Sequence, residues 1–148
     1  MSQRLKTVSR IGELLDHQKE VIELQCHQIQ SRLTQEKTRL TELDDQLQDN
    51  IGRFEEGLKN RWIVNQQDVD YLYGISSFLL AKIEWKNKEI TCINRELKEK
   101  QAVLLEAYKK MKAFEVFKNK MVFQEKREGD VGEQKSLDYL NLVKRSRK

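Results

Sequence analysis

The sequence of 148 residues contains no proline, six glycines and two cysteines, and aromatic side chains make up only 7% of it. A β-sandwich, a barrel or a doubly wound sheet needs turn residues about every dozen positions, so these folds are excluded. Cys26 and Cys92 form no CxxC pair, which is typical of reduced cytosolic thiols. The chain also lacks the roughly 20 consecutive apolar residues of a membrane span and the apolar stretch of a secretory signal near Met1. We therefore expect a soluble, cytoplasmic protein that does not insert into membranes.

Charged side chains, by contrast, occupy 35% of the positions, and Ala, Glu, Lys, Leu and Arg dominate the composition. This composition is typical of long helices and coiled coils. High charge with few aromatics also suits a disordered chain, but 18 leucines in a sustained period oppose that alternative. The net charge of +4 is too small to indicate nucleic-acid binding.

Two stretches of the sequence carry the apolar period of a coiled coil. In the first, the stripe consists of Val8, Ile11, Leu15, Ile22, Cys26, Ile29, Leu33, Leu40, Leu43, Leu47, Ile51, Phe54 and Leu58. The seven-residue series shifts by four at Leu33, which predicts a stutter in the supercoil there. In the second, mostly apolar residues occupy a positions 69, 76, 83, 90, 97, 104, 111 and 118 and d positions 72, 79, 86, 93, 100, 107, 114 and 121. This unbroken repeat predicts a left-handed coiled coil.

A short connection separates the two stretches and favours folding back within one chain. Asn65 is a good N-cap with Asp68 three residues later, and Val64 and Val69 occupy the hydrophobic-staple positions. The predicted fold is all-α: two long helices forming an antiparallel coiled-coil hairpin, in which position n faces about 125 − n. The segments are a first arm (1–58), a tip (59–65), a second arm (66–127) and a C-terminal helical extension with a basic tail (128–148).

The extension has no intramolecular partner under this pairing rule. Glu128–Gly132 contains two glycines and is expected to interrupt or loosen the helix, after which Asp130 and Glu133 would cap a new one. Four of the last five residues are basic, and a solvated tail that complements the helix dipole explains them better than a nucleic-acid patch.

No catalytic or metal-ligating constellation is present in the sequence. His17 and His27 are ten residues apart without an HExxH motif, and no glycine-rich phosphate loop occurs. We expect no enzyme activity, no cofactor and no metal. Large apolar side chains outside the a and d positions instead gather after the tip, at Tyr71, Tyr73, Ile75 and Phe78, and they indicate either a broadened seam or an exposed binding patch.

Two motifs resemble those of a known family. Asn60-Arg61-Trp62-Ile63-Val64-Asn65-Gln66-Gln67, opening a long amphipathic helix, resembles the hairpin tip of the flagellar FliJ family, and Glu133-Gln134-Lys135-Ser136-Leu137-Asp138 before a basic end resembles its C-terminal motif. The match covers residues 58–145. FliJ and its YscO-type virulence relatives are stalk proteins of type III export systems, with a fold similar to the γ stalk of rotary ATPases.

The resemblance implies a stalk at the cytoplasmic base of the export apparatus, and we expect the chain to be a monomer. One end would enter the hexameric export ATPase, and the other would reach the cytoplasmic domain of the export-gate membrane protein; export chaperones are possible further partners. By motif, the gate would bind Leu72, Ile75 and Leu79. The tip motif supplies Asn60, Arg61, Trp62, Gln66 and Gln67. The ATPase would bind Gln134, Leu137, Asp138, Leu140, Lys144 and Arg145.

Two other classes of function fit the same pattern. A chaperone-escort or adaptor coiled coil would bind export chaperones without any effect on ATP turnover. A structural homodimer would form a four-helix bundle that hides Tyr71, Tyr73 and Phe78.

Overall fold

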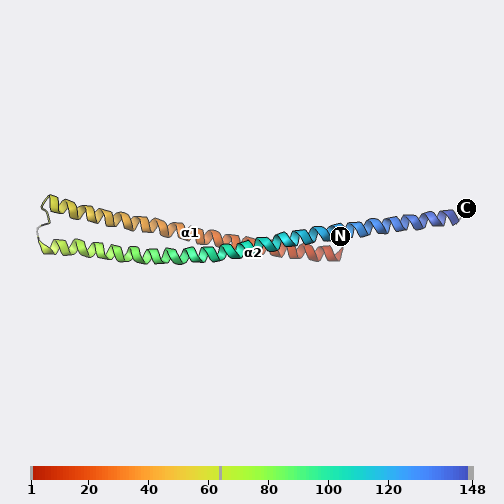
Figure 1. Ribbon diagram of the computed structural model, residues 1–148, viewed down its shortest axis with the longest axis horizontal. Helices are drawn as coiled ribbons and strands as arrows, with labels where there is room; N and C mark the ends of the chain where they lie inside the picture. The colour runs from red at the N-terminus through yellow and green to blue at the C-terminus, as the bar shows by residue number, and fades with distance from the viewer. Residues whose placement is uncertain (1, 64, 147–148) are drawn as a thin grey trace. The chain divides into compact units, whose positions relative to one another are not determined.

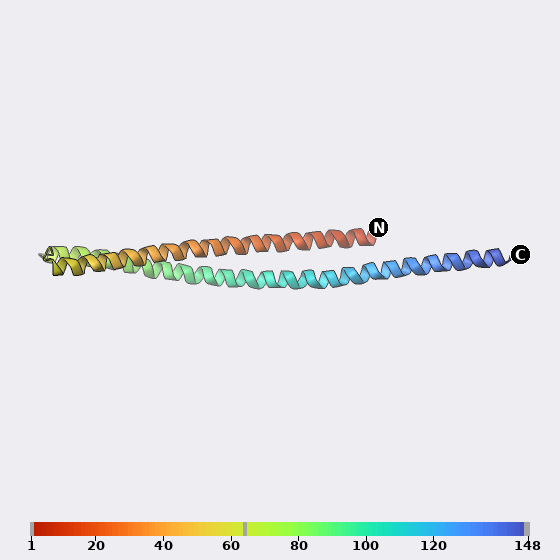
Figure 2. The same ribbon diagram turned by 90° about the horizontal axis from the view of Figure 1, so that it is seen from above.

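The computed structural model describes residues 2–63 and 65–146. These residues form two α-helices, α1 (Gln3–Lys59) and α2 (Gln66–Ser146), and include no strand. The helices are joined by a short connection and pack against each other with opposite directions (Figures 1 and 2). The predicted all-α helical hairpin is confirmed.

Contacts divide the chain into two compact units. We refer to Glu23–Ala102 as the tip unit and to Met1–Ile22 with Val103–Lys148 as the terminal unit. Each unit contains one stretch of α1 and one of α2, so each has its own part of the seam. In the tip unit the seam centres on a cluster of Ile29, Leu33, Ile90, Ile93 and Leu97, against which Leu40 packs.

On α2, every a and d position predicted from the sequence is buried or half-buried. The most buried of these side chains are Leu72, Leu79, Ile90, Ile93 and Leu97 in the tip unit and Met121 in the terminal unit. The seven-residue repeat therefore assigns this side of the seam correctly, because a helix in a coiled coil presents the same face every 3.5 residues on average.

On α1, the seam also consists of two unbroken seven-residue rows. One row is Leu5, Gly12, Lys19, Cys26, Leu33, Leu40, Leu47 and Phe54, and the other is Val8, Leu15, Ile22, Ile29, Glu36, Leu43, Asn50 and Gly57; all of these residues are buried or half-buried. The predicted stutter at Leu33 is wrong. Leu33 belongs to the first row, and the second row continues through Glu36. Because Glu36 is charged, an apolar pattern does not include it.

Three apolar residues assigned to the first-arm stripe lie outside the seam. Ile11, Ile51 and Leu58 are 45%, 39% and 56% exposed. Each stands next to a seam position held by Gly12, Asn50 or Gly57, which an apolar pattern does not mark.

The contacts between the helices confirm the predicted pairing rule. In the tip unit Asn50, expected to face residue 75, donates hydrogen bonds to the Leu72 carbonyl at 3.0 Å and to Ser76 Oγ at 2.7 Å. Arg32, expected near residue 93, pairs with Glu96. In the terminal unit the Ser2 hydroxyl donates to Glu125 Oε1 at 2.6 Å. The register is therefore the same in both units.

The connection contains one local signal that ends α1 and one that begins α2. Arg61 adopts a left-handed backbone with φ of 59°, which ends α1, and the Ile63 N–H donates to the Gly57 carbonyl at 3.3 Å. Asn65 Oδ1 accepts the Asp68 N–H at 3.0 Å, so the predicted N-cap of α2 is confirmed. The predicted staple involves Val64, which lies outside the described residues.

The predicted interruption at Glu128–Gly132 is wrong. The helix continues through this segment to Ser146, Asp130 lies within it rather than at a new N-terminus, and neither Gly129 nor Gly132 has a positive φ. Each glycine costs about 1 kcal/mol relative to alanine, which weakens a helix without ending it. From Lys126 to Leu142 every side chain is exposed, in agreement with the expected lack of an intramolecular partner.

A charged layer interrupts the apolar seam in the tip unit. Glu36 is only 8% exposed, and its carboxylate accepts from Arg39 Nη1 and from Lys86 Nζ, each at 2.6 Å. Lys86 occupies a d position of α2 and also donates to Glu89 Oε2 at 2.9 Å. The layer satisfies its own hydrogen bonds, as a polar group inside a seam must.

Substitution of Lys86 tests this layer. Lys86→Ala leaves a mostly buried carboxylate with one partner fewer, and we expect the free energy of unfolding to fall by about 1–2 kcal/mol. The double variant Glu36→Leu/Lys86→Leu replaces the pair by apolar seam residues and is expected to be at least as stable as the wild type. Urea denaturation followed by circular dichroism measures both, and a double variant less stable than Lys86→Ala would contradict this account.

Two glycines of α1 make a matched pair for testing the packing of the tip. A Cβ at Gly57 would overlap the Ile63 side chain and come within 2.8 Å of Trp62 Cζ2, whereas a Cβ at Gly52 meets nothing within 4 Å. Gly52→Ala is expected to stabilise the chain by about 0.5–1 kcal/mol through helix propensity. Gly57→Ala is expected to destabilise it by about 1–3 kcal/mol through overpacking. The same denaturation measurement decides, and equal effects of the two changes would refute the close packing of Ile63 on Gly57.

Candidate interaction site

The residues assigned to the export gate lie at the start of α2, two of them in the seam. Leu72 and Leu79 are each 6% exposed and pack toward α1, while Ile75 is half-buried beside them. A partner that approaches this segment would therefore meet Ile75 and its exposed neighbours before it meets either leucine.

A second apolar stripe, distinct from the seam, runs along α2 in the tip unit. It consists of Tyr71, Ile75, Phe78, Lys82, Trp85, Glu89 and Cys92, which follow one another at steps of four and three. Its aromatic members are spaced by seven residues, and Tyr71, Phe78 and Trp85 are 69%, 59% and 65% exposed. Sequence reasoning noted Tyr71 and Phe78 but missed Trp85. The seven-residue spacing at one heptad position was the signal that would have found it.

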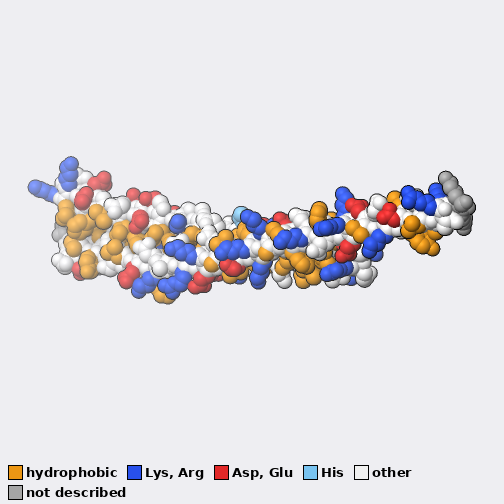
Figure 3. Space-filling view, turned by 45° about the vertical axis from the view of Figure 1, so that its right-hand side comes forward, with side chains coloured by type: hydrophobic (Ala, Val, Ile, Leu, Met, Phe, Trp, Pro, Cys, Tyr) orange, Lys and Arg blue, Asp and Glu red, His pale blue; other side chains and the backbone are white. Residues whose placement is uncertain are grey.

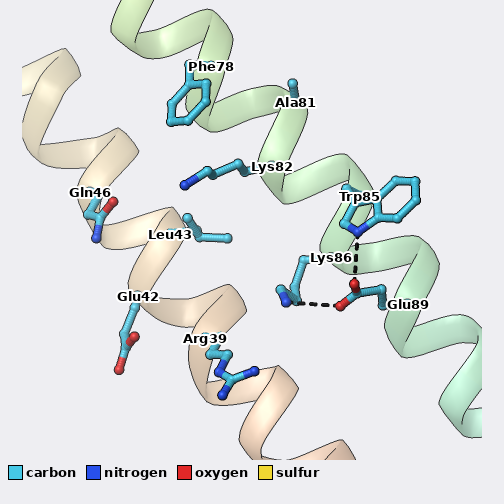
Figure 4. A pocket seen from close by; sticks show the side chains of 10 residues that line it. All are labelled: Arg39, Glu42, Leu43, Gln46, Phe78, Ala81, Lys82, Trp85, Lys86 and Glu89. Atoms are coloured by element: carbon cyan, nitrogen blue, oxygen red, sulfur yellow. Dashed lines mark hydrogen bonds and ion pairs between the residues drawn. The ribbon is translucent and has the colours of Figure 1, made fainter.

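An open groove lies beside this stripe, between α1 and α2 (Figure 4). It has a volume of about 540 Å³. Its lining is Arg39, Glu42, Leu43 and Gln46 from α1 and Phe78, Ala81, Lys82, Trp85, Lys86 and Glu89 from α2. A second groove of about 440 Å³ shares Trp85 and Glu89 and reaches Cys92 and Ile93. Apolar side chains thus alternate with charges of both signs along this side of the tip unit.

Hydrogen bonds orient the side chains around Trp85. Trp85 Nε1 donates to Glu89 Oε1 at 2.8 Å, and the other oxygen of Glu89 accepts from Lys86 (Figure 4). The Lys82 ammonium lies 4.5 Å from the centroid of the Phe78 ring, within cation–π range. The groove therefore presents an indole and a phenyl ring that are each held by a charged neighbour.

The same contacts shift two ionisation equilibria. Hydrogen bonds from Lys86 and then from Trp85 lower the pKa of Glu89 below its ordinary value of 4.5. Hydrogen bonds to Glu36 and then to Glu89 raise the pKa of Lys86 above 10.5. Both groups are charged in the middle of the pH range, which stabilises the network there.

The tip residues singled out by the motif are all exposed. Asn60, Arg61, Gln66 and Gln67 face solvent, and Trp62 is 49% exposed. Gln66 Nε2 donates to Asp70 Oδ1 at 3.0 Å, so this side chain is committed to its own helix. Figure 3 shows hydrophobic side chains gathered at the end of the molecule that carries this connection.

The residues assigned to the ATPase all lie on the exposed end of α2. Gln134, Leu137, Asp138, Leu140, Lys144 and Arg145 are exposed, and Gln134 Nε2 donates to Asp138 Oδ1 at 3.2 Å. Leu137 and Leu140 are 55% and 53% exposed. Tyr139 and Leu142, which sequence reasoning left out of this site, are 67% and 63% exposed.

These surfaces consist of exposed apolar and charged side chains. No group of three His, Cys, Asp or Glu side chains able to hold a metal occurs among residues 2–63 and 65–146. Cys26 is half-buried in the seam, and Cys92 is exposed on α2; both are free thiols. In the described part of the chain, neither helix has a segment long and apolar enough to cross a membrane.

The pKa shifts around Trp85 predict a pH-dependent contribution to stability. Glu89→Gln is expected to lower the free energy of unfolding near neutral pH. Because the folded pKa of Glu89 lies below 4.5, the difference from the wild type is expected to stay constant above that pH and to close as the pH falls through the folded pKa.

Urea denaturation at a series of pH values, from about 3 to about 8, measures this difference. The contribution of Lys86 has the opposite dependence: it is complete below pH 10.5 and is lost above it, as the pH rises through the raised pKa. A constant difference between wild type and Glu89→Gln down to the lowest pH would contradict the lowered pKa.

Comparison with known proteins adds no relative to this picture: no family model, curated protein or solved structure matches the chain.

Proposed function

We propose that this chain is a non-enzymatic central-stalk component of a type III protein export apparatus, flagellar or virulence-type. In this role it links the hexameric export ATPase to the cytoplasmic domain of the export-gate membrane protein and promotes export of substrates. The proposal comes from the resemblance of Asn60–Gln67 and Glu133–Asp138 to the FliJ and YscO motifs. The observation that carries it is the unequal length of the helices, because α2 continues well beyond its pairing with α1.

The hairpin supports a role as a stalk. A two-helix coiled coil has no interior in which to build a catalytic site, but the faces of its helices that lie outside the seam are available to partners. The register is held in the tip unit by Asn50 and by the layer of Glu36 and Lys86, so that the two helices cannot slide past each other without breaking hydrogen bonds. Resistance to sliding is what a part that transmits position or torque requires.

The exposed end of α2 is the proposed ATPase contact. It joins apolar side chains, Leu137 and Leu140 among them, to the basic residues Lys144 and Arg145 at the helix C-terminus. Apolar area supplies binding free energy and the cations add electrostatic attraction to an acidic surface. A single stalk in a six-fold ring contacts only some subunits at a time, and this asymmetry would bias their nucleotide states.

The proposed export-gate contact lies on α2 just after the tip. Ile75 offers part of its side chain to a partner, while Leu72 and Leu79 hold the helix against α1 and so position it. In this arrangement the chain is located peripherally at the cytoplasmic base of the apparatus.

Substitution at the exposed end of α2 tests the ATPase contact. Leu137→Asn/Leu140→Asn removes apolar surface without touching the seam, and we expect it to reduce stimulation of the export ATPase at least about tenfold. A matched control is Leu105→Asn/Val116→Asn, because Leu105 and Val116 are 54% and 50% exposed on the same helix. The control is expected to stimulate like the wild type.

ATP turnover by the hexameric export ATPase is measured with each full-length variant, together with binding to the gate domain. Retained gate binding with lost stimulation would place the two contacts on different parts of α2. Stimulation by Leu137→Asn/Leu140→Asn equal to that of the wild type would refute the proposed ATPase contact.

An export-chaperone escort is the second candidate function. The observation in its favour is the exposed aromatic stripe with Tyr71, Phe78 and Trp85, which offers more apolar surface than a gate contact at Ile75 requires. This function would show as chaperone binding that is lost on Trp85→Ala, with no effect of the chain on ATP turnover.

A further inference from the structure

The second stripe of α2 lies outside the seam, and its aromatic residues Tyr71, Phe78 and Trp85 are exposed in the tip unit, while Ile75 and Glu89 are half-buried. At 100° per residue, its positions centre about 110° around the helix from the a and d positions. That angle is close to the separation of the two contact faces of a helix in a four-helix bundle. The stripe has the steps of four and three of a seam, and its aromatic residues are more than half exposed. It therefore has the form of a second coiled-coil interface.

The charges on the stripe indicate which partner would bind it. Lys82 lies three residues before Trp85, and Glu89 lies four residues after it, so the stripe carries opposite charges on either side of a central indole. An antiparallel copy of the same stripe places each Lys82 opposite the partner's Glu89, with the two tryptophans near the axis. Such a surface is complementary to itself, which is the requirement of a two-fold symmetric interface.

We propose that two copies of this chain associate antiparallel through the second stripe, α2 against α2, with Trp85 near the two-fold axis. The proposal goes beyond the stalk function and does not rest on it. In the dimer the aromatic side chains of each copy lie in the groove of the other, between Leu43 and Phe78, and their exposed apolar area is removed from water.

The walls of the groove favour this occupant over a strongly charged partner. The groove carries charges of both signs in similar number, three cations and two carboxylates: Arg39, Lys82 and Lys86 against Glu42 and Glu89. An anionic membrane or an acidic peptide would meet the carboxylates of Glu42 and Glu89 at close range, and a basic peptide would meet the three cations. A partner with alternating charges and a central aromatic residue fits, and the chain itself supplies one.

Charge reversal tests the antiparallel register. In Lys82→Glu homodimers each introduced carboxylate would face the partner's Glu89, and in Glu89→Lys homodimers two ammonium groups would meet at each of these contacts. Each variant alone is expected to dimerise at least about tenfold more weakly than the wild type. In an equimolar mixture, each mixed dimer has opposite charges at both contacts. One contact pairs the introduced carboxylate with the introduced ammonium, and the other pairs native Lys82 with native Glu89. The mixture is therefore expected to recover dimers, and sedimentation equilibrium over a range of concentrations gives the masses.

A second pair of variants keeps the test independent of the hydrogen bonds that Glu89 makes within its own chain. Phe78→Asn is expected to weaken dimerisation, whereas Leu80→Asn is expected to leave it unchanged, because Leu80 is exposed to a similar degree, 55% against 59%, but lies off the stripe. Thermal unfolding of every variant checks that the helices are retained.

Three results would overturn the proposal. The first is a wild-type mass that stays at that of one chain up to the highest soluble concentration. The second is failure of the mixed variants to recover dimers that each lacks alone. The third is equal weakening by Phe78→Asn and Leu80→Asn, which would place self-association on another surface.

Discussion

The seam between α1 and α2 is the interaction on which the remaining features of this protein depend. Neither helix would be stable alone. The free energy of folding comes from burying, on each helix, two rows of residues spaced by seven against the rows of the other helix. Because the rows are unbroken on both helices, their positions decide which side chains are covered and which are left for partners. The exposed end of α2 and the second stripe both follow from this geometry, since each lies where the seam does not reach.

The seam is not uniformly apolar, and its polar members determine how the helices align. An apolar seam alone would gain similar energy in registers shifted by one heptad. Asn50 donates to the Leu72 carbonyl and to Ser76, and Glu36 accepts from Lys86, and a shifted register would break these hydrogen bonds across the seam. Stability is thereby exchanged for a unique alignment, as with polar residues at core positions of coiled coils generally.

Large apolar side chains remain exposed outside the seam, and contiguous exposed apolar surface usually marks a binding site. It is concentrated on α2, at the aromatic stripe of Tyr71, Phe78 and Trp85 and at Leu137 and Leu140. The two surfaces differ in chemistry. The stripe carries balanced charge around large rings, while the end of α2 combines leucines with a basic C-terminus. This difference is why we assign them to different partners, a second copy of the chain and an export ATPase.

The hairpin, the second-arm register, the pairing rule and the Asn65 cap were all predictable from the sequence, because each depends on periodicity or on contacts within a few residues. The tertiary structure decided the rest. The first-arm rows run through Glu36, Asn50 and Gly57, which look unlike seam residues until their partners Lys86, Ser76 and Ile63 are seen beside them. The continuity of α2 through Gly129 and Gly132 depends on the small cost of a glycine set against a long helix. Trp85 could have been found from its seven-residue spacing to Phe78, but the groove that it lines with Leu43 of α1 exists only once the two helices are packed together.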